Sequence, residues 1–164
     1  AIVTADDGNK PVAVVKDVIL AADGGLGDLL TVGGGSASTY QLGDPIREDF
    51  FVQLVGSEVY KNAVRSMSDI SKELLAKHNL TIDDVDVLLP HQANLRIMDA
   101  VGKKLNIPTE KVFCNIERYG NTSAGSVPIA LTEARNSGFI KENERMLICA
   151  FGAGFTWGAA LLEF

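Results

Sequence analysis

Apolar segments of strand length and of helix length alternate along this chain, and this alternation constrains its fold more than any other feature. Residues 85–89 have the length and the β-branched content of a buried strand. Residues 58–75 instead carry one apolar stripe at helical spacing. The stripe consists of Val59, Ala63, Met67, Ile70 and Leu74. Such alternation predicts an α/β fold with a mixed, mainly parallel sheet flanked by helices.

The remaining elements follow from apolar periodicity, caps and turn residues. The predicted strands are residues 1–5 and 12–22, joined by the turn DDGNKP, then 85–89, 111–120 and two strands around a glycine loop within 145–164. The predicted helices are 58–75 with Ser57 as cap, 95–107 with Asn94 as cap, and 123–137, which ends at Gly138. Pro128 removes a backbone donor, so it either bends the last helix or lies in its first turns.

The length and composition fit one ordinary globular domain. The chain has 164 residues, of which 46% are hydrophobic and 22% are charged. It contains no apolar run of the roughly 18–20 residues that span a bilayer and no signal-peptide pattern, which predicts no membrane contact. Its two cysteines, too few for a disulfide framework, predict a reduced, cytoplasmic setting. Cys114 and Cys149 predict no disulfide framework, no zinc site and inert, buried thiols. The chain opens on an apolar segment without Met, which favours a piece of a longer protein.

The charge is unevenly distributed. The net charge is −6, yet residues 96–118 carry more basic than acidic groups. The basic groups are Arg96, Lys103, Lys104, Lys111 and Arg118. A local basic segment on an acidic chain predicts an anionic partner, but it does not predict nucleic-acid binding, because a general basic surface is lacking. Lys103 and Lys104 also suit the last turn of a helix for electrostatic reasons alone.

Three junctions hold residues that could carry chemistry. His91 follows the strand at 85–89, Asn121 follows the strand predicted at 111–120, and glycines surround residue 153. Because parallel strands end at one edge of a sheet, His91 and Asn121 are expected to converge. Two neutral donors aimed at one oxygen would stabilise an enolate or oxyanion. The alternatives are that His91 and Asn121 only cap their loops, and that the glycines serve only a tight turn.

The motifs PHQANLRI, RYGNTSAGSVPIAL and AFGAGFTWGAALLEF together resemble β-ketoacyl-acyl-carrier-protein synthase III, a condensing enzyme of the thiolase superfamily. The resemblance covers nearly the whole chain but only the C-terminal half of the family's enzyme. It implies a thiolase-like fold, with residues 1–35 as the trailing hairpin and loop of the N-terminal half. Residues 45–164 would then form the catalytic C-terminal half.

The resemblance also implies a catalytic role for three residues. The family uses a Cys-His-Asn triad, in which His91 and Asn121 match the histidine and the asparagine. The nucleophilic cysteine belongs to the absent N-terminal half, so the isolated chain is expected to be inactive. The backbone N–H of Ala153 matches the oxyanion donor of the glycine loop.

The resemblance further implies binding residues and partners. Substrate or pantetheine contacts are implied for Gly56, Ser57, Asn94 and Phe155, and carrier-protein contacts for Lys61, Gln92, Arg96, Lys103 and Lys104. The implied partners are acyl carrier protein, acyl-CoA, the Cys-bearing half and a second copy in a homodimer. No metal or other cofactor is expected, because the CoA and phosphopantetheine thioesters are substrates. A related ketosynthase of secondary metabolism and a non-catalytic module that binds carrier protein or CoA remain alternatives.

Overall fold

The computed structural model describes residues 11–34 and 41–164. The strand predicted at 1–5 and most of the turn that follows it lie outside the described residues. Four strands form the main sheet in the order β1-β6-β5-β4. They span Val14–Ala22 (β1), Val87–Pro90 (β4), Arg145–Gly152 (β5) and Thr156–Glu163 (β6). A separate two-strand ribbon pairs β2 (Leu30–Thr31) with β3 (Gln53–Leu54).

The main sheet is mixed, as predicted, but it is not mainly parallel. β4 pairs with β5 in parallel, whereas β5 with β6 and β6 with β1 are antiparallel. The reason is the tight β5–β6 hairpin, which reverses the chain around the glycine loop. β1 pairs with β6 from Val14 to Ala22, so part of the segment 1–35 is an edge strand of this same sheet. The domain boundaries at 35 and 45 stay predictions.

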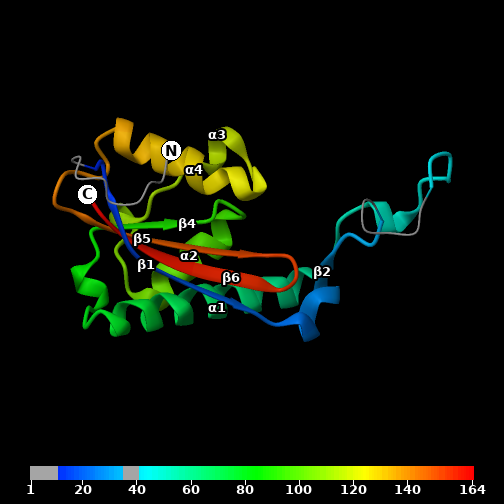
Figure 1. Cartoon of the computed structure of the whole chain (residues 1–164), viewed down its shortest axis with the longest axis horizontal. Coiled ribbons are helices and arrows are strands. Elements are labelled where there is room, and N and C mark those ends of the chain that lie inside the picture. The colour runs from blue at the N-terminus through cyan, green and yellow to red at the C-terminus, as the bar shows by residue number, and fades with distance from the viewer. Residues whose placement is uncertain (1–10, 35–40) are drawn as a thin grey trace.

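Helices cover both faces of this sheet (Figure 1). The long α1 (Gly56–Lys77) and α2 (Leu95–Leu105) lie on one face, and α4 (Ser126–Asn136) lies on the other with the short α3 (Ile116–Tyr119) beside it. Short 3₁₀ helices of one or two turns lie at Gly24–Leu29, Glu48–Phe50, Ile82–Asp84, Thr109–Lys111 and Ser123–Gly125. In the described part of the chain, no helix is both long and apolar enough to cross a bilayer.

The core is divided between the two faces of the sheet. Leu88 of β4 packs with the cluster under α1 and α2, whereas its neighbours Val87 and Leu89 pack with the cluster under α4. All three side chains are buried, because β4 is covered on both sides. This explains why residues 85–89 form a continuous apolar run rather than an alternating one.

Several local predictions are confirmed and others are corrected. Asn94 caps α2, where its side chain accepts a hydrogen bond from the Arg96 N–H at 2.9 Å. Pro128 lies in the first turn of α4, where its missing N–H removes no helical hydrogen bond. Ser57 is not a cap, because α1 already begins at Gly56 behind a Val55 N-cap that makes no side-chain bond.

The strand predicted at 111–120 is wrong. Only Val112 pairs with the sheet, through one parallel bridge to Leu88. The buried side chain of Gln92 then takes over the backbone bonds of this segment: it donates to the Phe113 carbonyl at 3.2 Å and accepts from the Asn115 N–H at 3.0 Å. A side chain thus replaces the ladder that a strand would form, and the chain turns into α3.

On the α4 side of the sheet, β1 leaves large apolar side chains exposed. Along β1, Val18 and Leu20 are 48% and 78% exposed although both are large and apolar. Together with Ile148 and Ala160 they line a groove of about 1970 Å³. This volume exceeds that of an ordinary ligand pocket, which holds about 300–1,000 Å³. The groove is therefore a broad open depression rather than a closed cavity, and the sheet, the first part of α1 and the loops that carry His91 and Asn121 all line it.

Candidate active site

His91 is held rigidly at the carboxyl end of β4. Its backbone N–H donates to the Cys149 carbonyl at 2.8 Å, which prolongs the β4–β5 pairing by one residue. Its ring Nδ1 lies 2.5 Å from the Ser126 hydroxyl oxygen at the start of α4. Burial lowers the pKa of His91 below the ordinary value of 6.5, because the charged imidazolium is poorly solvated there. The ring is therefore mostly neutral at pH 7 and lines the apolar groove.

Asn121 lies on the loop between α3 and α4 and lines the same groove as His91. Its side-chain oxygen accepts a hydrogen bond from the Ser123 N–H at 2.9 Å. That bond fixes the orientation of the amide, since the oxygen is turned back to the chain. The amide –NH₂ is then the end of Asn121 that can donate to a bound group.

The loop between β5 and β6 supplies the third part of the site. Ala153 is exposed and lines the groove, and its carbonyl accepts from the Thr156 hydroxyl at 3.0 Å. Gly154 has φ +116°, a backbone conformation that strains any residue with a Cβ. The glycine at this position therefore allows the tight reversal that brings the backbone of residue 153 to the groove.

The three junctions line one large groove, but only two of them follow strands. His91 and Gly152 follow the parallel pair β4 and β5, so both lie at one edge of the sheet. Asn121 does not follow a strand. It reaches the groove because the segment before it is tied to the His91 loop through the buried Gln92 side chain.

Gln92 is a structural residue, and its assignment as a carrier-protein contact is wrong. Its side chain is 1% exposed and donates to the Pro90 carbonyl at 2.9 Å, in addition to its two bonds with the 113–115 segment. No part of it is accessible to a protein partner. Instead, Gln92 fixes the spacing between the loop that carries His91 and the loop that leads to Asn121.

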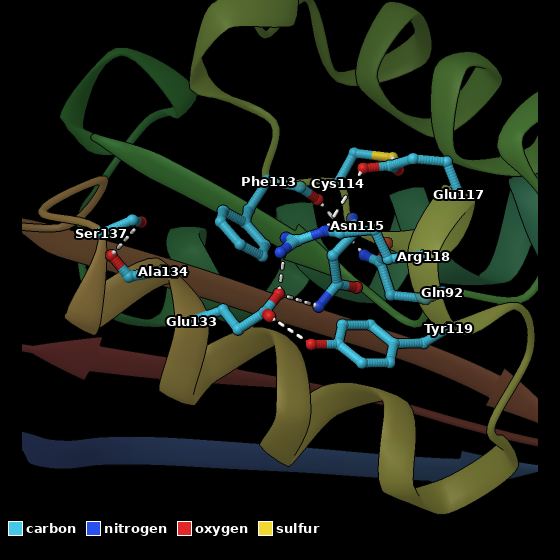
Figure 2. A network of polar contacts seen from close by, with 10 residues as sticks. All are labelled: Gln92, Phe113, Cys114, Asn115, Glu117, Arg118, Tyr119, Glu133, Ala134 and Ser137. Atoms are coloured by element: carbon cyan, nitrogen blue, oxygen red, sulfur yellow. Dashed lines mark hydrogen bonds and ion pairs between the residues drawn. The ribbon is translucent and has the colours of Figure 1, made fainter.

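A second polar cluster extends this connection to α4 (Figure 2). The Glu133 carboxylate on α4 accepts hydrogen bonds from Asn115 at 2.8 Å, from Arg118 at 2.7 Å and from the Tyr119 hydroxyl at 2.5 Å. These bonds, the one from Tyr119 foremost, lower the pKa of Glu133. The cluster holds the short α3 against α4 and so places the loop that follows, where Asn121 lies.

Of the four residues predicted to contact the substrate or its pantetheine arm, three line the groove and one does not. Gly56, Ser57 and Asn94 are exposed and line the groove beside His91. Phe155 does not: its side chain is fully buried and packs edge to face on Phe151, with ring centroids 4.7 Å apart. Its assignment as a substrate contact is therefore corrected, since it is a core residue that anchors the glycine loop.

The basic residues assigned to a carrier protein lie on α1 and α2. Lys61 and Arg96 line the mouth of the groove, where Lys61 pairs with Glu58 at 2.9 Å and Arg96 lies 5.8 Å from the centre of the Tyr60 ring. Two further lysines lie in the last turn of α2 and do not line the groove. These two are Lys103, which is exposed, and Lys104, which pairs with Asp69 at 3.1 Å.

Neither cysteine resembles a nucleophile. Cys149 is completely buried in β5, which raises the pKa of its thiol to about 12. Cys114 is partly exposed rather than buried in a strand, and its thiol lies 3.7 Å from the Glu117 carboxylate. Desolvation, followed by that carboxylate, raises the pKa of Cys114 as well. Neither cysteine lines the groove.

Sequence reasoning missed Ser126, the residue that touches the His91 ring. Ser126 is 2% exposed, and its hydroxyl also accepts from the Gln92 N–H at 3.3 Å. The motif that contains it was noted, but a serine at the start of a helix has an ordinary explanation as a cap. Nothing in the sequence indicates a contact across 35 positions.

Comparison with known proteins gives consistent matches. The family model "3-Oxoacyl-[acyl-carrier-protein (ACP)] synthase III C terminal" matches residues 75–164. A relative from Nitratidesulfovibrio vulgaris, named beta-ketoacyl-[acyl-carrier-protein] synthase III, is 55% identical over 152 residues, which cover 93% of this chain and 46% of the relative.

Solved structures match in the same way. The 3-oxoacyl-[acyl-carrier-protein] synthase III from Aquifex aeolicus superposes with a TM-score of 0.81 at 39% identity, over 95% of this chain and 46% of that chain. The priming β-ketosynthase of the R1128 polyketide pathway superposes with a TM-score of 0.78 at 31% identity, over 91% of this chain and 45% of that chain. The chain thus spans about half the length of the relatives that it matches.

Proposed function

Because the chain belongs to the 3-oxoacyl-[acyl-carrier-protein] synthase III family and has its thiolase-like fold, we propose that it forms the His- and Asn-bearing half of a condensing enzyme. The proposed reaction joins the acyl group of an acyl-CoA to malonyl-acyl carrier protein with loss of CO₂. The observation that carries the proposal is the shared groove, into which His91, Asn121 and the backbone at Ala153 all face.

His91 and Asn121 act on the malonyl thioester in this proposal. When the bond between the α-carbon and the carboxylate breaks, CO₂ leaves and the electron pair moves onto the thioester as an enolate. The ring N–H of neutral His91 and the amide of Asn121 donate hydrogen bonds to the enolate oxygen. Donors that are fixed before the reaction stabilise the developing charge without reorganisation, and one such donor is worth roughly 10²–10³ in rate.

The carbon–carbon bond forms in the second step. The enolate carbon attacks an acyl group held as a thioester on the cysteine of the other half, and that thiolate leaves. The Ala153 N–H donates to the oxyanion of the tetrahedral intermediate, which forms on attack and collapses as the thiolate leaves. The high pKa of Cys149 and the raised pKa of Cys114 support the assignment of the nucleophile to another polypeptide segment.

The carrier protein and CoA are proposed to approach over α1 and α2. Lys61, Arg96 and Lys103 put positive charge around and behind the groove mouth, where an acidic protein or a phosphate would be attracted. Lys104 contributes less, because Asp69 already neutralises it. Gly56 and Ser57 provide a narrow backbone wall along which a pantetheine arm can pass.

The apolar groove supports the remaining part of the proposal. Val18 and Leu20 would be covered by the Cys-bearing half, which would close the open face of the sheet into a tunnel. The complete enzyme is proposed to be a cytoplasmic homodimer that needs no metal or other resident cofactor. The isolated chain is proposed to be inactive.

The proposal is tested in the complete synthase with His91→Ala and Asn121→Ala. Each substitution should lower malonyl-thioester decarboxylation about 10²-fold or more, while acylation of the nucleophilic cysteine by acyl-CoA stays within about twofold. Lys72→Ala is the control, because Lys72 is exposed on α1 and does not line the groove. Loss of acylation with intact decarboxylation would refute these roles.

A second candidate is a priming ketosynthase of secondary metabolism. The match to the R1128 enzyme at 31% identity favours it, and the chemistry of His91 and Asn121 would be the same. A panel of acyl-CoA primers and carrier proteins, assayed on the complete enzyme, separates the two candidates. A protein that binds carrier protein but neither decarboxylates nor condenses would instead be a non-catalytic binding module.

A further inference from the structure

The contacts of the Ser126 hydroxyl determine where its proton lies. The Gln92 backbone N–H can only donate, so at 3.3 Å it uses one lone pair of the Ser126 oxygen. The other polar atom bonded to this hydroxyl is the Nδ1 of His91 at 2.5 Å. Among the described residues, Nδ1 is the one hydrogen-bond acceptor to which the Ser126 proton can point.

The proton position then determines the tautomer of His91. If Nδ1 carried a hydrogen, two donors would face the Ser126 oxygen and its own buried O–H would be left without an acceptor. Native structures rarely contain such a group, because an unpaired buried donor loses its bond to water without replacement. An unprotonated Nδ1 accepts the Ser126 proton instead. The single proton of a neutral imidazole must then lie on Nε2.

We propose that Ser126 is a positioning residue that holds His91 in the Nε2–H tautomer and turns this N–H toward the substrate carbonyl. This inference rests on the proposed function, because only a donor role for His91 makes the tautomer matter. Nδ1 is bound to α4 through Ser126, so Nε2 is the nitrogen of His91 that can reach a group in the groove. The Gln92 N–H directs the Ser126 hydroxyl proton toward Nδ1, and the bond from Ser126 in turn leaves the ring proton on Nε2.

The ring is also held in place mechanically. The His91 backbone N–H is hydrogen-bonded to the Cys149 carbonyl of β5, and the ring Nδ1 is hydrogen-bonded to Ser126 of α4. The proposed catalytic histidine is thus attached to two elements, β5 through its backbone and α4 through its ring. Loss of the Ser126 hydroxyl would release one of these attachments and allow the ring to rotate or to exchange tautomers.

The test uses the complete synthase with Ser126→Ala, Ser126→Thr and Ser68→Ala. Ser68 is a matched control, because its fully buried hydroxyl donates only to the Val64 carbonyl within α1, away from the groove. The two readouts are the ¹⁵N NMR shifts of the His91 ring and the separate rates of cysteine acylation and malonyl decarboxylation. The His91 signals are assigned by their loss in His91→Ala.

In the wild-type protein, Nε2 is expected to show the shift of a protonated ring nitrogen and Nδ1 that of an unprotonated one. Ser126→Ala should give averaged shifts and a decarboxylation rate lowered on the order of 10-fold, as when a histidine loses its orienting partner elsewhere, with acylation unchanged. Ser126→Thr keeps the hydroxyl and should restore both readouts. Ser68→Ala should change neither.

Two results would overturn the inference. One is a proton on Nδ1 in the wild-type protein, which decides the question even if Ser126→Ala fails to fold. The other is a folded Ser126→Ala protein with unchanged ring shifts and an unchanged decarboxylation rate. If the wild-type synthase shows the Nε2–H tautomer but no decarboxylation, the proposed function fails while the tautomer assignment stands.

Discussion

At the scale of single residues, neutrality is the property that the proposed reaction requires of its two donors. A histidine donates to an enolate oxygen without a competing proton transfer only if it is neutral and correctly protonated. Burial lowers the pKa of His91 and so supplies the first condition, and Ser126 supplies the second. Asn121 is neutral at every pH, and Ser123 fixes its orientation. Environment, rather than residue type alone, therefore makes these two groups suitable donors.

The same environment makes Cys149 unreactive, which gives a residue-scale prediction. With a pKa of about 12, fewer than about one thiol in 10³ is ionised at pH 8, and the side chain has no exposed surface. Iodoacetamide at pH 8 should therefore label Cys114 at least 10-fold faster than Cys149 in the folded chain. Mass spectrometry of the tryptic peptides measures both rates.

The denatured chain provides the control for this labelling. In denaturant both thiols should react at similar rates, because burial no longer separates them. Equal labelling of Cys114 and Cys149 in the folded protein would contradict the buried position of Cys149 in β5.

At the scale of elements, two pairs of segments near the site are joined by side-chain hydrogen bonds rather than by backbone pairing. Gln92 joins the 91–94 loop to the 113–115 segment, and Glu133 joins α3 to α4. A third side chain, Asp17, connects the edge strand β1 to the end of α1. Its carboxylate accepts from Lys77 Nζ at 2.7 Å and lies 2.8 Å from His78 Nε2.

The Asp17 connection predicts a pH-dependent stability. Hydrogen bonds from Lys77 and then His78 lower the pKa of Asp17 from 3.8 to about 2. Because the folded-state pKa is depressed, the stabilisation is fully present above about pH 4 and is lost as the pH falls toward 2. Asp17→Asn should therefore lower the urea midpoint at pH 7, and the difference from wild type should shrink steadily below pH 4.

Asp28→Asn is the control for Asp17→Asn, since Asp28 is exposed and forms no ion pair within residues 11–34 and 41–164. It should leave the urea midpoint almost unchanged at both pH values. A stability difference for Asp17→Asn that is the same at pH 7 and pH 3 would show that the carboxylate charge is not what holds β1.

The end of α2 predicts a salt-dependent encounter with a carrier protein. Lys103 is exposed there, so Lys103→Glu should raise the carrier-protein KM of the complete synthase several-fold at low salt, with kcat unchanged. The effect should fade above about 0.5 M salt, because exposed charges are screened. Steady-state kinetics at two ionic strengths measure it.

Lys141→Glu makes the same charge change before β5, at the opposite edge of the sheet from His91. It should leave the carrier-protein KM unchanged. If Lys103→Glu and Lys141→Glu behave alike, Lys103 is an ordinary cation at a helix end and does not meet the partner.

At the scale of the whole molecule, the open face of the sheet is the dominant feature. A groove lined by Val18, Leu20 and Ile148 leaves apolar surface in water that a monomer of this size rarely exposes. The site residues lie along this same groove. The chemistry and the unpaired surface therefore share one face, which supports the proposal that a second segment covers both.

The exposed face predicts that the isolated chain associates and does not condense substrates. Sedimentation velocity at tens of micromolar should detect species larger than the 17.5 kDa monomer. Leu20→Lys should shift the distribution toward the monomer, because it places a charge in the apolar groove. Lys72→Glu, an exposed change on α1, serves as the control. A strictly monomeric wild-type chain, or one that makes condensation product, would contradict this prediction.

Much of the fold could be predicted from local patterns. α1, α2, α4, β4 and the β5–β6 hairpin all coincide with predicted elements to within a few residues. Each has an apolar periodicity, a capping residue or a turn glycine that is visible in the local sequence, such as Asn94 before α2. The prediction of a strand at 111–120 was wrong because the side chain of Gln92, 21 residues before Phe113 and 23 before Asn115, takes the backbone hydrogen bonds that a strand pairing would need.

The sequence by itself determined the α/β alternation and pointed to His91 and Asn121 as the proposed donors, since apolar periodicity and short motifs are local properties of the chain. Only the tertiary structure decided that the sheet is largely antiparallel, that Gln92 and Phe155 are buried, and that Ser126 touches His91. Apart from the β5–β6 hairpin, which is local, these facts depend on contacts between segments that lie far apart in the sequence. Which side chains are buried and which groups they bond to follow from these contacts, and a short stretch of sequence does not determine them.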